Sequence, residues 1–555
     1  MSKVVPQSDT PPAQRLVSGA VGRAAPAVLV LSVLPLLWSA AVRLIALLNY
    51  PYPHDGLEGT LLHEARLLWS GQPLYQPLER LRFVSAPYPP LHPLLLGLAD
   101  QIGGPHVFWG GRLLSLTAAL GVAVLIVLIV RRAGGIWLGG LLGTSLFLSA
   151  PPVLLWASRV KPDLTALLWT AMGLYLAIRL TTDHRPSTTD GQRPTTDVRL
   201  QPEHIAAHRW PVVGGRWSVV AFCFALAFFT KQTDVMAPFG TGLALLIADL
   251  RAFYRDGERI GYLGRVPMRW RTLSYGLSYL AFTLGVWALL DLITAGQYSA
   301  HVWGLHRSEW WSAALLSKFV GLLTPYLPAV LLALLVLIRA FWTGRALIPA
   351  CYALVVPISL LGAGETGANH NHLLECLLAL AIGVGIAAGW LAELVRSANT
   401  REFPRKSINY SRYSRIVSGA LLVLLAVQIG LAYRPQQWYL GELAPDDPPA
   451  RYLTFIRAAP GEVLADDVGL LYAAGRPLRY DDPSTMGPAA NSRVWDQSGL
   501  LQEIAEWRFS AILIPVNVER ESVDATGRWT PEMLAAIRAH YKLAFHDTIF
   551  TYVPK

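Results

Sequence analysis

Two carboxylates, Asp55 and Glu58, stand three residues apart shortly after the first apolar segment. On the first turn of a helix both would lie on one face, where a pair of carboxylates can act as a general base and its helper. The same spacing fits a helix cap, with Asp55 as the N-cap residue and Glu58 as its capping-box partner. The local pattern leaves catalysis and capping open, and it favours capping.

Two cations and a carboxylate lie close together in a later loop, as Arg159, Lys161 and Asp163. Guanidinium and ammonium groups bind phosphate oxygens, so this set suits the phosphate of a lipid. Cations that extend along a membrane surface, with Asp163 capping the helix that follows, explain the same residues equally well. The loop therefore predicts either a phosphate site or an ordinary membrane anchor.

Lys231 and Gln232 form another polar pair, in a short hairpin between two apolar segments. Because the hairpin is so tight, the ammonium group must lie at or below the membrane surface. An ionisable group at that depth is costly to bury and is usually functional. We therefore predict that this pair binds substrate.

A last polar group precedes a late apolar segment and contains His370, Asn371, His372 and Glu375. Hydrogen bonding to a polyhydroxylated or phosphorylated substrate explains these side chains with few assumptions, and helix capping is the alternative. A His-x-His pair with one carboxylate is a weak metal signal. We predict no cofactor and no bound metal, although a divalent metal stays open.

The elements that must position these residues follow from composition. Of the 555 residues, 53% are hydrophobic and 15% charged, with a mean hydropathy of +0.38. Soluble domains carry about 25% charged residues. Long apolar blocks account for the difference, which excludes an ordinary cytosolic enzyme and predicts a polytopic α-helical membrane protein. The net charge of +10 is spread over short loops, so it reports topology and predicts no nucleic-acid partner.

Eleven apolar segments are candidates for crossing a bilayer, which needs about 17–25 residues. The stretch 89–102 is too short and is expected to lie flat at the membrane surface, within a long first outer loop. Lys and Arg concentrate in alternate loops, which predicts a plasma-membrane protein with a cytoplasmic N-terminus and all the polar candidates outside. The predicted spans are 24–48, 107–130, 136–156, 164–180, 216–230, 233–250, 273–294, 316–338, 346–363, 373–395 and 416–433.

Residues 434–555 are soluble in composition and are expected to form a small extracytoplasmic α/β domain after a membrane domain at 1–433. This domain either covers the site or recruits the acceptor. Four aspartates near the predicted strands, Asp466, Asp467, Asp481 and Asp482, are expected to be turn residues. Strand patterns lie at 462–465, 511–515 and 549–553, and helical patterns lie near 449–458, 498–508 and 531–540.

Several short motifs fall in one order on the predicted outer side: Asp55-Gly-x-Glu-Gly, Gly71-Gln-Pro-Leu-Tyr, Tyr88-Pro-Pro-Leu, Gly111-Arg, 159–163, Thr230-Lys-Gln and 369–375. Together they resemble the GT-C superfamily of lipid-dependent glycosyltransferases, in particular the protein O-mannosyltransferase and aminoarabinose-transferase group. The resemblance covers most of the membrane part and implies that the acidic pair of the first outer loop is the catalytic centre. The two acids are adjacent in the mannosyltransferases but separated here, so which of them is the base stays open.

Chemistry supports the same interpretation. The inner loops contain no Gly-rich phosphate loop, so a nucleotide sugar is not expected. A donor outside would be a sugar on a polyprenyl phosphate, transferred with inversion to a hydroxyl of a glycan, lipid or protein. The reaction needs a carboxylate base and cations on the leaving phosphate. Asp55, helped or replaced by Glu58, is the predicted base. The predicted substrate-binding residues are Arg159, Lys161, Asp163, Lys231, Gln232, His370, Asn371, His372 and Glu375.

A transporter or lipid flippase is the alternative function. It predicts an inverted repeat, broken helices and charges near the membrane centre. The sequence shows no repeat, the predicted span count is odd, and charged residues within spans (Arg43, Asp291 and Glu393) lie towards span ends. The pattern therefore favours the transferase.

Overall fold

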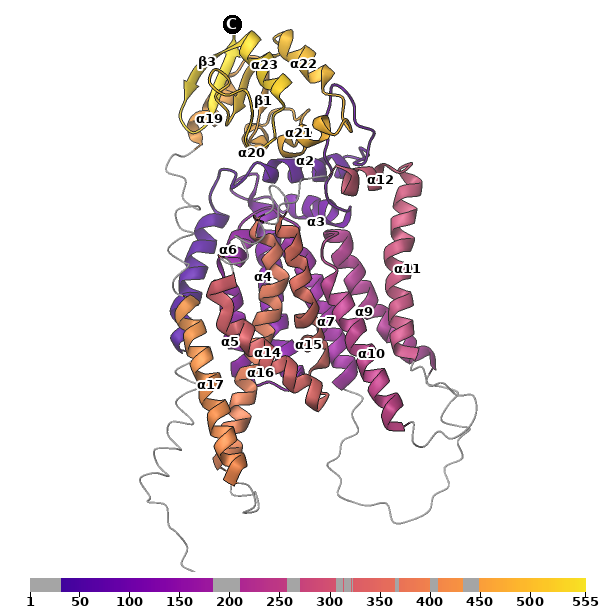
Figure 1. The fold of residues 1–555 in the computed structure, drawn as a ribbon. Helices are drawn as coiled ribbons and strands as arrows, with labels where there is room; N and C mark the ends of the chain where they lie inside the picture. The colour runs from indigo at the N-terminus through magenta and orange to yellow at the C-terminus, as the bar shows by residue number, and fades with distance from the viewer. Residues whose placement is uncertain are drawn as a thin grey trace, which may run out of the picture.

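A bundle of helices is capped at one end by a smaller mixed domain in the computed structural model of the chain (Figure 1). Three of the loops whose Lys and Arg residues predict the orientation lie partly outside the described residues. These loops are 181–215, 251–272 and 396–415. The structure describes residues 31–182, 210–256, 270–305, 323–364, 369–399, 408–432 and 449–555, and the single positions 313 and 321.

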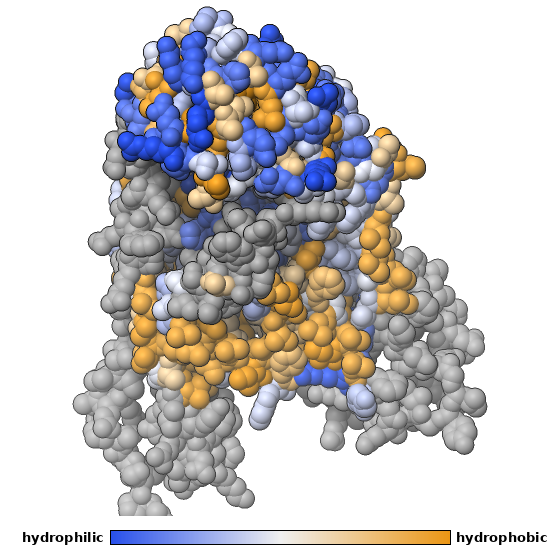
Figure 2. Space-filling view, turned by 45° about the horizontal axis from the view of Figure 1, so that its top comes forward, coloured by the Kyte–Doolittle hydropathy of each residue, from blue (hydrophilic) through white to orange (hydrophobic). Residues whose placement is uncertain are grey.

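Helices occupy all eleven places where the sequence predicts a span. Seven of the described helices are long and apolar enough to cross a membrane, or eight if one bent pair is a single span. Figure 2 shows apolar side chains gathered on the face of the bundle turned towards the viewer. The chain is thus a polytopic helical membrane protein. The bundle helices are Leu31–Leu48, α4 (Trp109–Arg132), α5 (Trp137–Ser149), α6 (Pro151–Ala157), α7 (Asp163–Thr182), α9 (Trp210–Thr230), α10 (Met236–Asp256), α11 (Trp270–Ile293), α14 (Leu327–Thr343), α15 (Leu347–Val355), α16 (Leu374–Asn399) and α17 (Ile408–Ala432).

The segment predicted as one span over 136–156 is a broken helix, which corrects the prediction. α5 and α6 are bent by 69° at their junction, where Ala150 is extended and Pro151 begins α6. Proline supplies no N–H to the helical ladder, so the helix stops at Ser149 and restarts in a new direction. Every residue of α6 is buried, and its direction sets the position of the charged loop that follows.

α2 (Leu57–Trp69) and α3 (Leu91–Asp100) lie across the end of the bundle, beneath the mixed domain (Figure 1). α3 occupies the stretch that is expected not to cross. The two helices pack closely, because a Cβ on Gly97 would stand 2.0 Å from the Trp69 ring. The Trp69 indole also donates to the Leu94 carbonyl at 3.0 Å. This crosswise layer brings the acidic pair and the Tyr-Pro-Pro motif to the same end of the bundle.

Residues 449–555 form the mixed domain around a sheet ordered β1-β2-β4-β3, and Figure 2 shows its mainly hydrophilic surface. β1 and β2 are parallel, and the other pairs are antiparallel. The three predicted strands and three predicted helices are present, whereas β3, α20 and α21 are not predicted. The elements are α19 (Ala450–Ala458), β1 (Glu462–Ala465), α20 (Val468–Ala473), α21 (Pro483–Asn491), α22 (Ser498–Ala505), β2 (Phe509–Ile514), α23 (Pro531–His540), β3 (Tyr541–His546) and β4 (Phe550–Pro554).

The mixed domain sits directly on the crosswise layer. Gly59 of α2 meets Gly469 so closely that a Cβ on Gly59 would stand 2.6 Å from the Gly469 Cα, so this contact requires glycine. The Phe83 N–H donates to the Arg479 carbonyl at 2.7 Å, and its carbonyl accepts from the Asp481 N–H at 3.1 Å. Backbone hydrogen bonds therefore join the loop between α2 and α3 to the mixed domain. The predicted domain boundary at 433–434 lies outside the described residues.

Candidate active site

Glu58, at the start of α2, is completely enclosed. Arg112 of α4 pairs with both of its oxygens, at 3.0 Å from Nε and 2.7 Å from Nη2. The backbone N–H groups of His54 and Val160 donate to the same carboxylate at 2.7 and 2.9 Å. Burial opposes ionisation, but the Arg112 charge and these hydrogen bonds lower the pKa of Glu58 to about 2. This carboxylate is thus permanently charged and fully hydrogen-bonded.

Asp55 lies three residues earlier and is only partly enclosed. Its Oδ2 is 3.2 Å from the Arg159 guanidinium and 3.2 Å from the Lys161 ammonium. Its Oδ1 is buried and has no hydrogen-bond partner among the described residues. α2 begins without a side-chain cap, and only Glu58 reaches back to the preceding backbone. The predicted capping box is therefore absent: the N-cap residue is Gly56, and Glu58 accepts from the N–H of His54, two residues before Gly56.

A second ion pair lies beside the first. The Lys231 ammonium is 2.5 Å from Asp163 Oδ1, and both side chains are buried. The Asn371 side chain hydrogen-bonds to Asp163, and the Lys161 charge also acts on this carboxylate. The crosswise layer, the loop after α6, the α9–α10 hairpin and η5 (His370–Leu373) thus meet in one charged centre.

Two residues of the segment that starts with Tyr-Pro-Pro complete this centre. His92 on α3 is 1% exposed, and neither ring nitrogen has a partner within the described residues. Burial lowers the pKa of His92 to about 4, and the charges of Asp163 and Lys161 also act on it, so the ring is neutral at pH 7. Tyr88 lies edge-on to His92 with the ring centroids 6.4 Å apart, within electrostatic reach of Asp55 and Asp163.

Buried polar atoms without partners gather in this centre. Native proteins pair most such atoms with protein or with water. Their concentration therefore marks a place where water or a ligand binds. Over the described ranges these atoms include both nitrogens of His92, both carboxylate oxygens of Glu375, and one atom each of Asp55, Arg159, Gln232 and Asp234.

The remaining predicted site residues are placed differently. Glu375 is buried within electrostatic reach of Lys231, as a member of the centre. Gln232 donates its amide nitrogen to two backbone carbonyls, those of Pro87 and Val302, at 3.1 and 3.3 Å. The amide nitrogen of Gln232 therefore fixes two backbone segments, and only its side-chain oxygen is left for a ligand.

The two histidines of the His-x-His pair lie on η5. The His372 ring packs against Gly362 of η4 (Val356–Gly364). His370 is half-buried, and its backbone N–H donates to the Asn369 side chain at 2.7 Å. The part of the chain that the structure describes contains no group of three His, Cys, Asp or Glu side chains placed to hold a metal.

Comparisons with known proteins find matches in structure alone. No protein-family profile and no curated protein matches the sequence. ArnT from Cupriavidus metallidurans bound to undecaprenyl phosphate matches with a TM-score of 0.54 at 16% identity, over 94% of this chain and 97% of that one. Its apo state matches with a TM-score of 0.55 at 14% identity over the same shares. The chain has the GT-C fold.

A weaker likeness is found to an oligosaccharyltransferase from Archaeoglobus fulgidus, with a TM-score of 0.45 at 11% identity, over 94% of this chain and 74% of that one. The two ArnT matches confirm the expected resemblance at the level of the fold. The ArnT match extends over nearly the whole chain, so it includes both the membrane bundle and the mixed domain.

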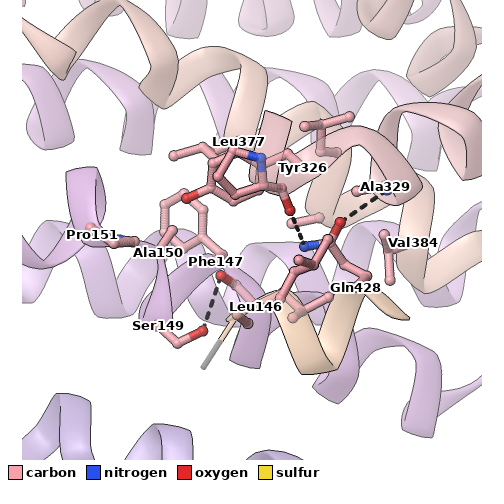
Figure 3. Close-up of a pocket in the computed structure, with 15 residues that line it drawn as sticks. Leu146, Phe147, Ser149, Ala150, Pro151, Tyr326, Ala329, Leu377, Val384 and Gln428 are labelled. Atoms are coloured by element: carbon pink, nitrogen blue, oxygen red, sulfur yellow. Dashed lines mark hydrogen bonds between the residues drawn. The ribbon is translucent and has the colours of Figure 1, made fainter. Parts of the chain in front are cut away.

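An apolar cavity of about 20 Å³ lies among α5, α6, α14, α16 and α17 (Figure 3). Ala150 and Pro151 line it at the bend between α5 and α6, and Leu377 lines it two residues after Glu375. Gln428 of α17 also borders the cavity, but its amide is used by backbone groups of α14 and η3 (Thr324–Tyr326), as the dashed lines in Figure 3 show. The cavity wall is thus almost wholly hydrocarbon.

The mixed domain also contributes to the surroundings of Asp55. A Cβ on Gly56 would stand 3.3 Å from the Asp466 carbonyl oxygen, so the turn after β1 packs on the start of α2. Burial and the Asp55 charge raise the pKa of Asp467 to about 7. Of the four aspartates expected in turns, Asp482 caps α21, while the other three lie where the mixed domain meets the crosswise layer.

The sequence patterns do not predict Arg112, His92 or Tyr88 as members of the centre. Gly111-Arg112 and Tyr88-Pro-Pro-Leu are motifs to which the sequence assigns no role. Two features of the sequence could have indicated them. His92 is a lone histidine after the Tyr88-Pro-Pro-Leu motif, and Arg112 is an arginine near the start of a predicted span. Arg112 pairs with a carboxylate 54 residues away, a distance in sequence that no local pattern covers.

Proposed function

We propose that this protein is an integral-membrane glycosyltransferase that moves a sugar from a polyprenyl phosphate to an acceptor hydroxyl at the extracytoplasmic surface. The environment of Asp55 carries the proposal. Two cations hold one carboxylate oxygen, and the other oxygen is buried without a partner. A carboxylate in that condition can accept a proton next to cations that can hold a phosphate.

Asp55 acts as the general base in this proposal. Its unpaired oxygen takes the proton of the acceptor hydroxyl while the hydroxyl oxygen bonds to the anomeric carbon. The bond between that carbon and the phosphate oxygen breaks, and its electron pair leaves with the lipid phosphate. Because attack comes from the face opposite the phosphate, the anomeric centre is inverted. No further reactant is needed.

Arg159, Lys161 and Lys231 stabilise the leaving phosphate. Each is already oriented by a carboxylate, Asp55 or Asp163, so little ordering is needed when negative charge develops. A lysine ammonium has three donors and arginine has five, so each cation can bind a phosphate oxygen as well. His92, neutral and unpartnered, supplies one further N–H donor.

Glu58 is a positioning residue in this proposal, not the base. Its hydrogen-bonding capacity is used by Arg112 and by two backbone N–H groups. Those N–H groups belong to His54, immediately before Asp55, and to Val160, between Arg159 and Lys161. One enclosed carboxylate therefore fixes the backbone of the base and the backbone of two cations relative to each other.

The donor class follows from cations at the end of an apolar bundle. The cations suit a phosphate, and the exposed apolar side chains of the bundle suit a lipid tail in the bilayer. The matched ArnT structure holds undecaprenyl phosphate, which supports a lipid-linked donor for this chain. Glu375 lies within electrostatic reach of Lys231. In this proposal Glu375, Asn371, His370 and His372 bind hydroxyls of the sugar or the acceptor.

Binding of undecaprenyl phosphate tests the proposal without knowledge of the sugar, because this lipid is the shared product. Native mass spectrometry of the full chain in detergent should show binding of undecaprenyl phosphate and at least tenfold weaker binding of undecaprenol. Lys231→Met should weaken phosphate-lipid binding about tenfold, while Lys542→Met, on β3, should not change it. Equal binding of the alcohol and the phosphate would overturn the proposal.

Catalysis needs a second measurement on the same preparation. Glycosyl polyprenyl phosphates labelled in the sugar should release lipid phosphate and transfer label to an envelope acceptor. Uptake of labelled lipid across vesicles without cleavage of the sugar–phosphate bond would instead support the transporter.

A further inference from the structure

Residues 85–88, here called the strap, are clamped by side chains from other parts of the molecule. The strap connects the backbone bridge at Phe83 to the Tyr-Pro-Pro motif, and it ends with Tyr88 in the charged centre. Its backbone groups bind Asp481 Oδ1 (Ser85 N–H, 3.0 Å), Glu64 Oε1 (Ala86 N–H, 2.8 Å), His301 Nδ1 (Ser85 carbonyl, 2.9 Å), Gln232 Nε2 (Pro87 carbonyl, 3.1 Å) and the Tyr75 hydroxyl (Tyr88 carbonyl, 2.7 Å).

The conformation of the strap is imposed by these contacts. Ala86 has φ +40°, in the left-handed region that residues with a side chain rarely adopt. It is completely buried, and its N–H donates to Glu64. Ala86 lies two positions before Tyr88. The Glu64 contact therefore helps to set where Tyr88 lies.

Two of the clamping groups are carboxyls from opposite sides of the domain interface. Glu64 on α2 is 1% exposed and Asp481 in the mixed domain is 0% exposed. They bind N–H groups of consecutive residues, so they lie close together. Each uses one oxygen for the strap and leaves the other, Glu64 Oε2 or Asp481 Oδ2, without a partner in the described chain.

Two ionised carboxylates do not remain buried side by side, whereas one proton between them makes a strong O–H···O⁻ hydrogen bond. That proton would satisfy both remaining oxygens at once. We infer that Glu64 and Asp481 share one proton and act as positioning residues that seat the mixed domain on α2 and set the strap. The inference goes beyond the proposed function, because seating does not depend on which reaction Tyr88 serves.

One further carboxylate and one cation act on the pair. Asp482 acts on both carboxyls, and Arg82 acts on Asp481. Tyr75 and Tyr88 face Glu64 as neutral phenols, and the His301 ring binds the strap carbonyl. Burial raises the pKa of Glu64 to about 8 and that of Asp481 well above its usual range.

A carboxyl whose folded pKa is raised stabilises the folded state most at low pH. The contribution of Glu64 is complete below pH 4.5, its ordinary pKa, and declines as the pH rises to about 8. Above that pH it is lost. We therefore expect seating of the mixed domain to weaken from pH 5 to pH 8 and to change little at higher pH.

Hydrogen–deuterium exchange of the full chain tests this inference without any transfer assay. Peptides covering 81–88 and 478–484 should lose at least tenfold protection between pH 5.5 and pH 8.5, after correction for the intrinsic exchange rate. Glu64→Gln should keep high protection at both values, since its amide N–H donates permanently to Asp481 Oδ2. Glu519→Gln, an exposed carboxylate of the mixed domain, should behave like the parent.

Constant protection in the parent across this range would overturn the inference. So would a Glu64→Gln variant with the pH dependence of the parent. Should Glu64→Gln not fold, the parent series decides alone, and Asp481→Asn repeats the comparison from the other side of the interface. Failure of lipid binding would refute the proposed function and leave these exchange results standing.

Discussion

The two ionic centres at the start of α2 are only three residues apart and are built in opposite ways. The centre around Glu58 is closed: one arginine and two N–H groups use the whole carboxylate, and neither Glu58 nor Arg112 is exposed. The centre around Asp55 is open, with one carboxylate oxygen paired and the other buried without a partner. Both are charged, but only one has capacity left for a ligand.

Whether a carboxylate is fully paired distinguishes a structural role from a catalytic role better than its charge or its burial does. A closed pair fixes backbone and gains nothing from a ligand. An open group costs free energy in the folded protein unless water or a ligand satisfies it, so it persists where function requires it. We expect substitutions in the closed centre to reduce stability and substitutions in the open centre to reduce activity.

The largest expected effect is that of Asp55→Asn on transfer. The amide keeps the shape of the side chain but cannot accept a proton, so transfer should fall by about 10²–10⁴-fold, the usual contribution of a general base. The rate is measured as lipid phosphate released from a labelled glycosyl polyprenyl phosphate. The thermal midpoint of the variant should stay near that of the parent. Transfer at the parental rate would exclude Asp55 as the base.

Glu58→Ala should show the opposite behaviour. Removing one partner of a buried ion pair leaves the other charge buried and unpaired, which costs about 3–5 kcal/mol. The free energy of unfolding, or the thermal midpoint in detergent, should fall accordingly. Asp55→Ala is the matched control in the open centre and should fall far less. Equal destabilisation by the two variants would remove the distinction between the centres.

The sequence predicts the residues of this region better than their roles. It places Asp55 and Glu58 on one face and brings Arg159, Lys161 and Lys231 to the same end of the bundle. The assignment of roles depends on Arg112, which meets Glu58 from another helix. A partner that far along the chain decides which carboxylate is closed, and local spacing contains no information about it.

Prediction of the fold from local sequence is limited in a similar way. Long apolar runs predict the helices of the membrane bundle, because backbone groups buried in a membrane must be hydrogen-bonded within the segment. The bend at Ala150 and the strand β3 were not predicted. The bend depends on two prolines inside an otherwise continuous apolar run, and β3 begins directly after α23 with no turn residues between them. Local sequence patterns predict where an element breaks or begins less clearly than they predict a continuous apolar helix.

Acid should distinguish the closed centre by its pH dependence. The pKa of Glu58 is lowered from 4.5 to about 2 in the folded chain. A lowered pKa gives stability that is present above pH 4.5 and is lost as the pH falls towards 2. A shift of this size corresponds to about 3 kcal/mol. Unfolding followed between pH 5 and pH 2.5 should show this loss in the parent and not in Glu58→Gln. A parallel decline in both proteins would contradict it.

The smallest expected effect belongs to His92, which extends the open centre to α3. Its imidazole is neutral and both nitrogens lack partners among the described residues, so one N–H can bind the lipid phosphate. One neutral hydrogen bond contributes about 1 kcal/mol, so His92→Phe should lower kcat/KM for the donor only about five- to tenfold. His92→Gln retains a donor and should recover most of the rate.

Because the pKa of His92 is about 4, the ratio of parent to variant should stay constant from pH 6 to pH 8. A ratio that changes through this range would mean that the ring titrates during turnover, and His92 would then belong to proton transfer with Asp55 and not to phosphate binding.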